Sequence, residues 1–338
     1  MAAQSRHRLC DGSGTGGANP TGQRASMIQL IVPAQRGRLL DRMAQAIARI
    51  ARQQRLTDQP IQVTHRPVSA VGTLTDSLRA ALPDSLSLLL VGDRSYAGMM
   101  IKRQPGWQQL AAVAGLATED SLLWVNSQSP YASLGQWVEA MGNAPTAPMV
   151  GGDGSNTQDH LLWRLLQASL HLDLQYVPYQ GSGAASVQLV DRRIEAHVNS
   201  AGEEIENWRA GRVRPLCLFS EHARTYTGAT PAGVGAAEVP SAAAQGVDLC
   251  YRSTYGVLAA ADCPPRDVRE GAQLLANVCA TDDWQAFLAA EYLNAGYLSP
   301  AQFEGYLKND FDRHATLLSG VSLQSPSVYG SRPSRANG

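Results

Sequence analysis

Residues 150–183 read VGGDGSNTQDHLLWRLLQASLHLDLQYVPYQGSG, and this stretch decides the fold class. It predicts a glycine-rich turn, an amphipathic helix over residues 159–170, a strand over 174–177 and a second turn at 179–183. Strands that alternate with helices pair in parallel, so their carboxyl ends meet at one edge of a sheet. We therefore expect the two turns to be neighbours and to form half of a small-molecule binding cleft.

The alternation of strands and helices continues on both sides of this stretch. Upstream, apolar runs at residues 28–32, 61–63 and 86–91 predict strands, with helices over 39–55 and 72–82 between them. Elsewhere we predict strands over 121–126, 145–150, 194–198, 214–219 and 255–260, and helices over 134–141, 184–190, 203–210, 265–279, 282–295 and 300–318. The pattern favours an α/β protein with two doubly wound units.

The composition is that of an ordinary globular protein. The chain has 338 residues, of which 44% are apolar and 17% charged, enough for two lobes with a core each. The net charge of −1 argues against a nucleic-acid partner, because such proteins carry a basic face. No apolar run approaches the length of about 20 residues that a membrane span needs. Residues 1–26 show no signal peptide, and we expect them to be disordered, like the tail 324–338.

The cysteines suggest neither a disulfide framework nor a zinc site. They are odd in number and form no Cys-x-x-Cys pair, and they stand at Cys10, Cys217, Cys250, Cys263 and Cys279. We interpret them as free thiols, with a bridge between Cys250 and Cys263 as the alternative.

The first turn has the composition of an anion-binding helix start. The small residues from Gly151 to Thr157, among them Gly151, Gly152 and Gly154, let backbone N–H groups converge, and Ser155, Asn156 or Thr157 can cap the helix that follows. Free N–H groups and the helix dipole attract a carboxylate or a phosphate. The turn is not a Walker A loop, because no Gly-Lys-Ser/Thr follows. A plain capped turn explains the same residues, so both interpretations stay open here.

The next two strand ends carry further polar candidates. Tyr179, Gln180 and Gly181 follow the strand over residues 174–177, where Tyr179 can line the cleft and Gln180 can donate hydrogen bonds. Asn199 occupies the equivalent place after the next strand. A turn that only starts a helix is the alternative at both positions.

The loop after the first strand supplies the candidates on the facing side. Arg36, Gly37 and Arg38 lie between the strand over residues 28–32 and its helix. Two guanidinium groups can hold one anion in a bidentate manner. A solvated surface pair is the alternative.

The sequence contains no catalytic motif. It lacks a Gly-x-Ser-x-Gly elbow and a His-Glu-x-x-His pair, and its histidines are scattered. We expect no catalytic residue, no metal site and no cofactor. An enzyme on the same scaffold would have to assemble its site from distant residues, and turnover of a bound acid would reveal it.

Taken together, the motifs resemble those of the tripartite tricarboxylate transporter substrate-binding proteins, the Bug-type extracytoplasmic receptors. The resemblance runs from about residue 28 to 318, and it lies in the order and spacing of the motifs. They are Ile-Gln-Leu-Ile-Val-Pro at 28–33, Asp41, His-Arg-Pro at 65–67, Pro-Asp-x-x-x-Leu-Leu at 83–89, the turn and helix start at 152–161, Val-Pro-Tyr-Gln-Gly-Ser at 177–182, Val-Pro-Ser at 239–241 with Gln-Gly at 245–246, Trp-Gln-x-Phe-Leu at 284–288 and Gly-Tyr-Leu-Ser-Pro at 296–300.

This resemblance implies a two-lobed periplasmic-binding-protein fold, a type II Venus flytrap in which each lobe is a doubly wound, mostly parallel sheet. Lobe 1 would be discontinuous, with residues 27–124 plus 220–323, and lobe 2 would hold 125–219. A small organic carboxylate, such as a di- or tricarboxylate, an amino acid or an aromatic acid, would bind between the lobes. The protein would be a periplasmic monomer that presents its ligand to the permease subunits of a membrane transporter.

Two departures from the family pattern affect the expected site. The first loop of the family is rich in glycine, whereas here Gly37 stands between Arg36 and Arg38, and Gln180 replaces a lysine. Together with the lack of a visible signal peptide, these changes motivate an alternative function. In that alternative the chain is a degenerate relative that acts as a sensory or protein-interaction module.

Overall fold

The computed structural model describes residues 25–67, 74–79, 82, 84–92, 109–155, 157–227 and 235–319. The strands are β1 Met27–Val32, β2 Ile61–His65, β3 Ser85–Val91, β4 Leu110–Asn126, β5 Met149–Asp153, β6 Gln175–Tyr179, β7 Ala196–Ser200, β8 Val213–Leu218, β9 Arg224–Thr227, β10 Ala236–Val239, β11 Arg252–Ala260 and β12 Asn294–Leu298. The helices are α1 Leu39–Gln53, α3 Leu74–Arg79, α5 Leu134–Gly142, α6 Gln158–Leu170, α7 Ser182–Val190, α8 Ala201–Arg209, the 3-10 helix Ala243–Gln245, α9 Pro265–Cys279, α10 Asp282–Ala290 and α11 Pro300–Ser319. The predicted α/β alternation is confirmed.

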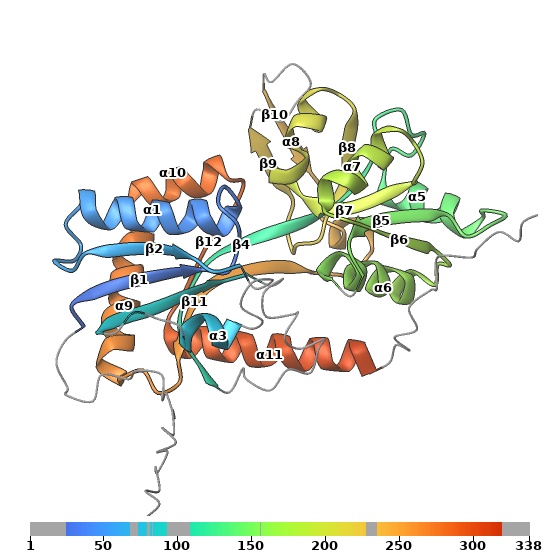
Figure 1. Ribbon diagram of the computed structural model, residues 1–338. Coiled ribbons are helices and arrows are strands. Elements are labelled where there is room, and N and C mark those ends of the chain that lie inside the picture. Colours follow the sequence, from blue (N-terminus) through green and yellow to red (C-terminus); the bar gives the residue numbers. More distant parts are fainter. Residues whose placement is uncertain are drawn as a thin grey trace, which may run out of the picture.

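The long strand β4 is the central element of the molecule (Figure 1). Its first part pairs with β11 and β12, and its last part, from Ser121 onward, pairs with β7 and β8. One sheet therefore runs in the order β2-β1-β3-β11-β4-β7-β5-β6. We call the strands on the β2 side of this crossing, together with β12, the first section and those on the β6 side, together with β8, the second section.

Each section contains one parallel set of strands. β1 pairs in parallel with β2 and β3, and β5 pairs in parallel with β6 and β7. The pairings that β4 and β11 make in this sheet are antiparallel, and β9 and β10 form a separate antiparallel pair. The sheets are thus mixed, with parallel strands at the two ends of the order and antiparallel strands at the crossing.

Helices cover both faces of each section, as a doubly wound fold requires. In the first section, α1, α9 and α10 pack on one face, and α3 and α11 pack on the other. In the second section, α5 and α6 cover one face, while α7 and α8 cover the other. The strands alternate accordingly, since Leu30 belongs to one core cluster and Ile31 to the opposite one.

The helix α1 shows how sequence pattern sets this packing. Its buried residues Met43, Ile47 and Ile50 recur at helical spacing and face the first core. The helix ends near Arg55, which adopts a left-handed conformation with φ 54°. The prediction of a helix here is confirmed, with an end two residues earlier than expected.

Three predictions about elements need correction. The helix expected over residues 282–295 ends at Ala290, where Tyr292 takes φ 58°, and the chain then forms β12. The sequence pattern predicts no helix or strand between residues 219 and 255, but this part of the chain contributes β9, β10 and a 3-10 helix. The strand expected over 121–126 is the end of the 17-residue β4. Short strands flanked by glycine and alanine escape detection by hydrophobic pattern.

Cys217, Cys250, Cys263 and Cys279 are free thiols, so the alternative of a Cys250–Cys263 bridge is wrong for this structure. Cys10 lies outside the described residues, as do most of residues 1–26 and the tail 324–338. None of the described helices is long and apolar enough to cross a membrane.

Candidate functional site

The first two glycines of the predicted turn belong to a strand. Gly151 and Gly152 lie in β5, which ends at Asp153. A Cβ atom at Gly152 would lie 2.7 Å from the Cβ of Asp159 and 2.9 Å from the hydroxyl of Tyr176. These glycines are therefore needed for close packing of β5 against α6 and β6, and the interpretation that they gather free N–H groups is wrong.

The turn itself consists of residues 154–157. Gly154 has φ +64°, a conformation that favours glycine. Thr157 is the N-cap of α6, where its hydroxyl accepts from the amide of His160 at 3.4 Å and donates to the carbonyl of Asp153. Ser155 is exposed, and Asn156 lies outside the described residues. The capped turn is thus confirmed, with Thr157 as its cap.

The expected proximity of the two turns is confirmed. The Gly154 amide donates to the carbonyl of Tyr179 at 2.8 Å. Asp153 Oδ1 accepts from the amide of Gly181 at 2.9 Å, and Gly181 is the N-cap of α7 with φ +90°. One carboxylate therefore joins the end of β5 to the start of α7.

The two side chains of the second turn differ in environment. Tyr179 is half-buried at the end of β6. A Cβ placed on Gly151 would lie 3.0 Å from the Tyr179 ring. Burial raises the pKa of its hydroxyl. Gln180 is exposed and makes no hydrogen bond with the described residues. Tyr179 is positioned to form a wall, and Gln180 is available to a ligand.

Asn199 lies in the strand β7 and is buried, whereas we had expected it in a turn beyond the strand. Its Oδ1 accepts from the amide of Ser200 at 2.9 Å, and its carbonyl accepts from Trp124 Nε1 at 3.1 Å. Its Nδ2 is buried and has no partner among the described residues. A buried amide donor without an acceptor is costly, and a ligand or a water molecule at Asn199 Nδ2 would satisfy it.

A buried contact between a histidine and a glutamate lies on the same face of β7, and no sequence motif predicts it. His197 Nε2 is 3.1 Å from Glu204 Oε1, and both side chains are fully buried. Burial alone would raise the pKa of Glu204, but His197 and the hydrogen bonds from Asn207 and Ser186 outweigh it and lower that pKa. Only the order strand–turn–helix in the sequence could have indicated that residues 197 and 204 meet.

The helix start of α6 carries a stacked histidine. The ring of His160 stacks on Tyr176, with centroids 4.3 Å apart, and its Nε2 accepts from Arg164 Nε at 3.1 Å. Burial and the nearby Arg164 lower the pKa of His160 to about 4. The imidazole is therefore neutral at neutral pH and adds no positive charge to this edge.

The loop at residues 35–38 is held by the first turn of α1. Gly37 has φ +79°, and its amide donates to Asp41 Oδ2 at 2.7 Å. His65 Nε2, at the end of β2, lies 2.7 Å from Asp41 Oδ1. Burial alone would raise the pKa of Asp41, but the contacts with Gly37 and His65 outweigh it and hold that pKa below its usual value.

The side chains of the two arginines of this loop lie at the surface. The side chains of Arg36 and Arg38 are exposed and make no ion pair with the described residues. This loop and the turn at residues 154–157 lie in different sections of the sheet. Direct contact between the sections occurs beside the turn, where Gln158 Nε2 of α6 donates to Ser253 Oγ of β11. The loop at residues 35–38 thus follows the parallel strand β1 of the first section, and the turn at residues 154–157 follows the parallel strand β5 of the second.

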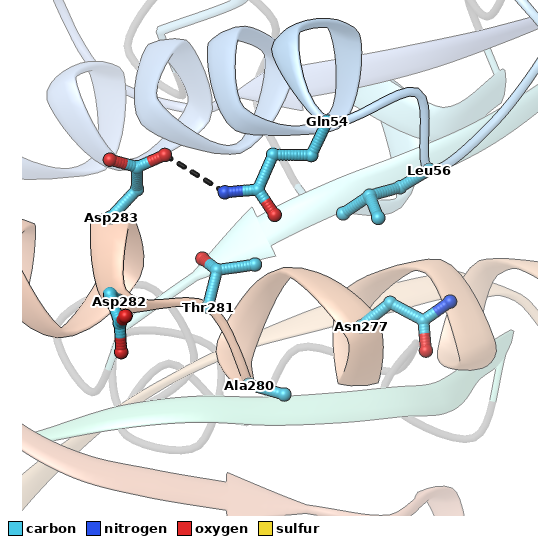
Figure 2. A pocket seen from close by; sticks show the side chains of 7 residues that line it. All are labelled: Gln54, Leu56, Asn277, Ala280, Thr281, Asp282 and Asp283. Carbon is cyan, nitrogen blue, oxygen red and sulfur yellow. Dashed lines mark hydrogen bonds between the residues drawn. The ribbon is translucent and has the colours of Figure 1, made fainter.

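A surface cavity of about 610 Å³ lies elsewhere (Figure 2). It is formed where the end of α1 meets the junction of α9 and α10, and Gln54 Nε2 donates to Asp283 Oδ2 across it at 2.9 Å. None of the predicted site residues lines it. In the part of the chain that the structure describes, no group of three or more His, Cys, Asp or Glu side chains could hold a metal ion.

The fold is the mixed α/β fold of periplasmic binding proteins, as comparison with solved structures shows. A TctC solute binding protein from Polaromonas, determined with no ligand, matches with a TM-score of 0.72 and 17% identity over 90% of this chain and 100% of that chain. MatC from Rhodopseudomonas palustris with bound malate gives 0.64 and 18%, covering 86% and 98%. An R. palustris protein with adipate gives 0.66 and 18%, covering 87% and 96%. At these identities the likeness establishes the fold alone.

Residues 44–323 match the sequence profile described as tripartite tricarboxylate transporter family receptor, and the chain belongs to this family. The family is one of receptors rather than enzymes. Protein BugT of Bordetella pertussis is 26% identical over 212 residues, which are 61% of this chain and 64% of BugT. The matched region is thus less than two thirds of the length of that relative. The loop at residues 35–38 precedes the family match.

Proposed function

We propose that this chain is a solute-binding receptor that captures a small organic carboxylate between its two sheet sections. The observation that carries the proposal is the junction of the two turns, in which Asp153 fixes Gly181 and Thr157 caps α6. The turn leaves the exposed Ser155 and Gln180 beside a helix N-terminus, where an anion is stabilised. Arg36 and Arg38 supply positive charge from the other section.

The class of ligand follows from these groups and from the family. The turn at residues 154–157 offers hydrogen-bond donors, and the loop at residues 35–38 in the other section offers two guanidinium groups. Such a set of groups suits an acid with more than one carboxylate. Malate and adipate in the two R. palustris structures belong to that class. We place amino acids and aromatic acids second, because they need only one anionic contact.

The remaining parts of the proposal concern the setting of the receptor. We infer that it works as a monomer in the periplasm and that permease subunits of a tripartite tricarboxylate-type transporter recognise its closed form. We also infer that lobe 1 comprises residues 27–124 plus 220–323 and lobe 2 residues 125–219. The crossing of β4 between the sections near Ser121 supports a boundary close to residue 124.

A thermal-shift screen tests the proposal. Purified protein, unfolded and refolded to remove carried-over ligand, is mixed with malate, adipate, citrate, aspartate and nicotinate. A ligand that binds only the native state raises the melting temperature, by an amount that grows with its concentration. We expect a shift with at least one di- or tricarboxylate. A folded protein that responds to none of these acids contradicts the proposal.

One observation favours a second candidate function. The loop at residues 35–38 precedes the family match and carries arginines in place of glycines. A relative that has lost transport and serves as a sensory or protein-interaction module would tolerate such a change. Failure of every acid in the screen, together with a partner protein that binds the wild-type chain and not a loop variant, would favour this candidate.

A further inference from the structure

The side chain of Arg42 connects the loop at residues 35–38 with the end of α10. Its Nη1 donates to the carbonyl oxygen of Gly37 at 2.5 Å. Its Nε and Nη2 donate to the two carboxylate oxygens of Glu291 at 2.6 and 2.7 Å. The guanidinium thus uses one donor for the loop at residues 35–38 and two donors for a fork-like pair with the end of α10.

Both backbone polar groups of Gly37 are fixed from the first turn of α1. Asp41 accepts from the Gly37 amide at 2.7 Å, while Arg42 donates to the Gly37 carbonyl. A glycine with φ +79° has many alternative conformations, so these contacts select one of them. Arg36 and Arg38 flank Gly37, so the selected conformation sets the directions in which their side chains extend from the loop.

The other partner of Arg42 belongs to a turn that touches the second section. The carbonyl oxygen of Glu291 would lie 3.4 Å from a Cβ placed on Gly202 of α8. The next residue, Tyr292, has its hydroxyl 2.7 Å from Arg209 Nη2, also of α8. Residues 291–292 therefore form a contact between α10 of the first section and α8 of the second.

We propose that Arg42 is a positioning residue for the binding site, because it fixes the loop at residues 35–38 and ties that loop to the contact between the two sections. The inference rests on the proposed function in so far as that loop binds the acid. Arg42 thereby holds Gly37 in a fixed position relative to the turn at residues 291–292, which contacts α8. Arg42 itself need not touch the ligand.

Two variants separate positioning from simple stabilisation. In Arg42→Gln both contacts are weakened. In the exchanged pair Arg42→Glu with Glu291→Arg the ion pair between α1 and α10 is restored, but a carboxylate at position 42 cannot donate to the Gly37 carbonyl. The matched control is Arg49→Gln, which replaces an exposed arginine of the same helix whose Nη1 donates to Gln53 Oε1 at 3.1 Å.

Binding of malate, adipate and citrate is measured by calorimetry for each variant. We expect Arg42→Gln and the exchanged pair to bind about tenfold more weakly than wild type, as the loss of a charge-assisted hydrogen bond predicts. We expect the exchanged pair to recover the melting temperature and Arg49→Gln to behave as wild type. Full recovery of affinity in the exchanged pair overturns the proposal, because the ion pair alone would then suffice.

Hydrogen exchange without any ligand keeps the proposal testable if no acid binds. Peptides that cover residues 35–38 should exchange faster than in wild type in Arg42→Gln and in the exchanged pair. In Arg49→Gln they should exchange at the wild-type rate. Peptides from β2 serve as an internal reference. Unchanged exchange in the loop overturns the positioning role. Faster exchange together with absent acid binding would leave Arg42 as a positioning residue and would contradict only the proposed function.

Discussion

The carboxylate of Asp153 accepts a hydrogen bond from the amide of Gly181 over 2.9 Å, and this contact joins two turns that are 28 residues apart in the sequence. Because Gly181 is the N-cap of α7, the bond satisfies one N–H group at a helix start and fixes the angle at which α7 leaves the sheet. The carboxylate of Asp153 therefore helps to set the geometry of the candidate site on the second section, together with the bond from the Gly154 amide to the Tyr179 carbonyl.

Replacing Asp153 tests that dependence. We expect Asp153→Ala to lower the free energy of unfolding by about 1 to 2 kcal/mol, since a hydrogen bond to a charged group is lost. Asp153→Asn keeps an acceptor oxygen and should lose less. Urea denaturation measures the effect, with Asp173→Ala as an exposed control. Equal stabilities of Asp153→Ala and Asp173→Ala would contradict this role.

The glycine at position 152 should not tolerate a methyl group. A Cβ there would lie 2.7 Å from Asp159 and 2.9 Å from Tyr176, so Gly152→Ala forces β5, β6 or α6 to shift. We expect a loss of about 1 to 3 kcal/mol in the free energy of unfolding. Gly183→Ala is the control, because a Cβ at that position meets nothing within 4 Å. If both variants unfold at the same urea concentration, the packing interpretation is wrong.

Asp120 stands where β4 passes from one section to the other, and it is buried. Its carboxylate accepts from Arg252 Nε at 3.0 Å, from Arg224 Nη1 at 3.2 Å and from Asn294 Nδ2 at 2.9 Å. Asp120→Ala removes an acceptor that two partly exposed arginines share, so we expect it to cost about 1 to 3 kcal/mol of stability. Thermal and urea unfolding measure the loss, and the exposed Asp58→Ala serves as control.

A smaller effect than that of Asp58→Ala would show that the crossing does not depend on this carboxylate. A loss of cooperativity in Asp120→Ala, seen as two separate unfolding transitions, would instead show that the sections have become independent. Either result can be read directly from the unfolding curves.

Acid should destabilise the protein through His160. Its folded-state pKa is about 4, below the usual 6.5, so between these values the unfolded chain binds more protons at this position than the folded chain. The contribution of neutral His160 to stability is therefore complete above pH 6.5 and is lost as pH falls toward 4. His160→Phe keeps a ring beside Tyr176 and cannot titrate.

We expect the melting temperature of His160→Phe to fall less steeply over that range than the wild-type value. Carboxylates such as Glu204, whose pKa is lowered, change the stability only near and below their usual pKa, which is 4.5 for a glutamate. The comparison is therefore made above pH 5. Parallel curves for the two proteins between pH 5 and 6.5 would contradict the assigned neutrality of His160.

Much of the fold could be predicted because buried parallel strands and amphipathic helices carry strong patterns. β1 and α9 were predicted within one residue of their bounds. The pattern is weak where glycine and alanine form strands, so it predicts a helix where β12 lies and a turn at the glycines of β5. In both cases tertiary packing, which composition does not encode locally, decides the conformation.

The candidate site was predictable only in part. The proximity of Gly154, Tyr179 and Gly181 follows from parallel topology, which the sequence pattern indicates. The burial of Asn199 depends on how far β7 extends, and a shift of a strand end by two residues moves it from turn to sheet. The contact of Arg42 with Glu291 joins residues 249 apart, so no local pattern could reveal it.

Calorimetric titration of the ligand-free protein with malate, adipate and citrate tests the central claim most directly, when wild type is compared with the double variant Arg36→Gln with Arg38→Gln. We expect saturable one-to-one binding of at least one acid by wild type, and binding at least about tenfold weaker by the double variant, because charge-assisted contacts are lost. Arg49→Gln should titrate as wild type. Absence of saturable binding in folded wild-type protein, or equal affinity in the double variant, would contradict a carboxylate site between the two sections.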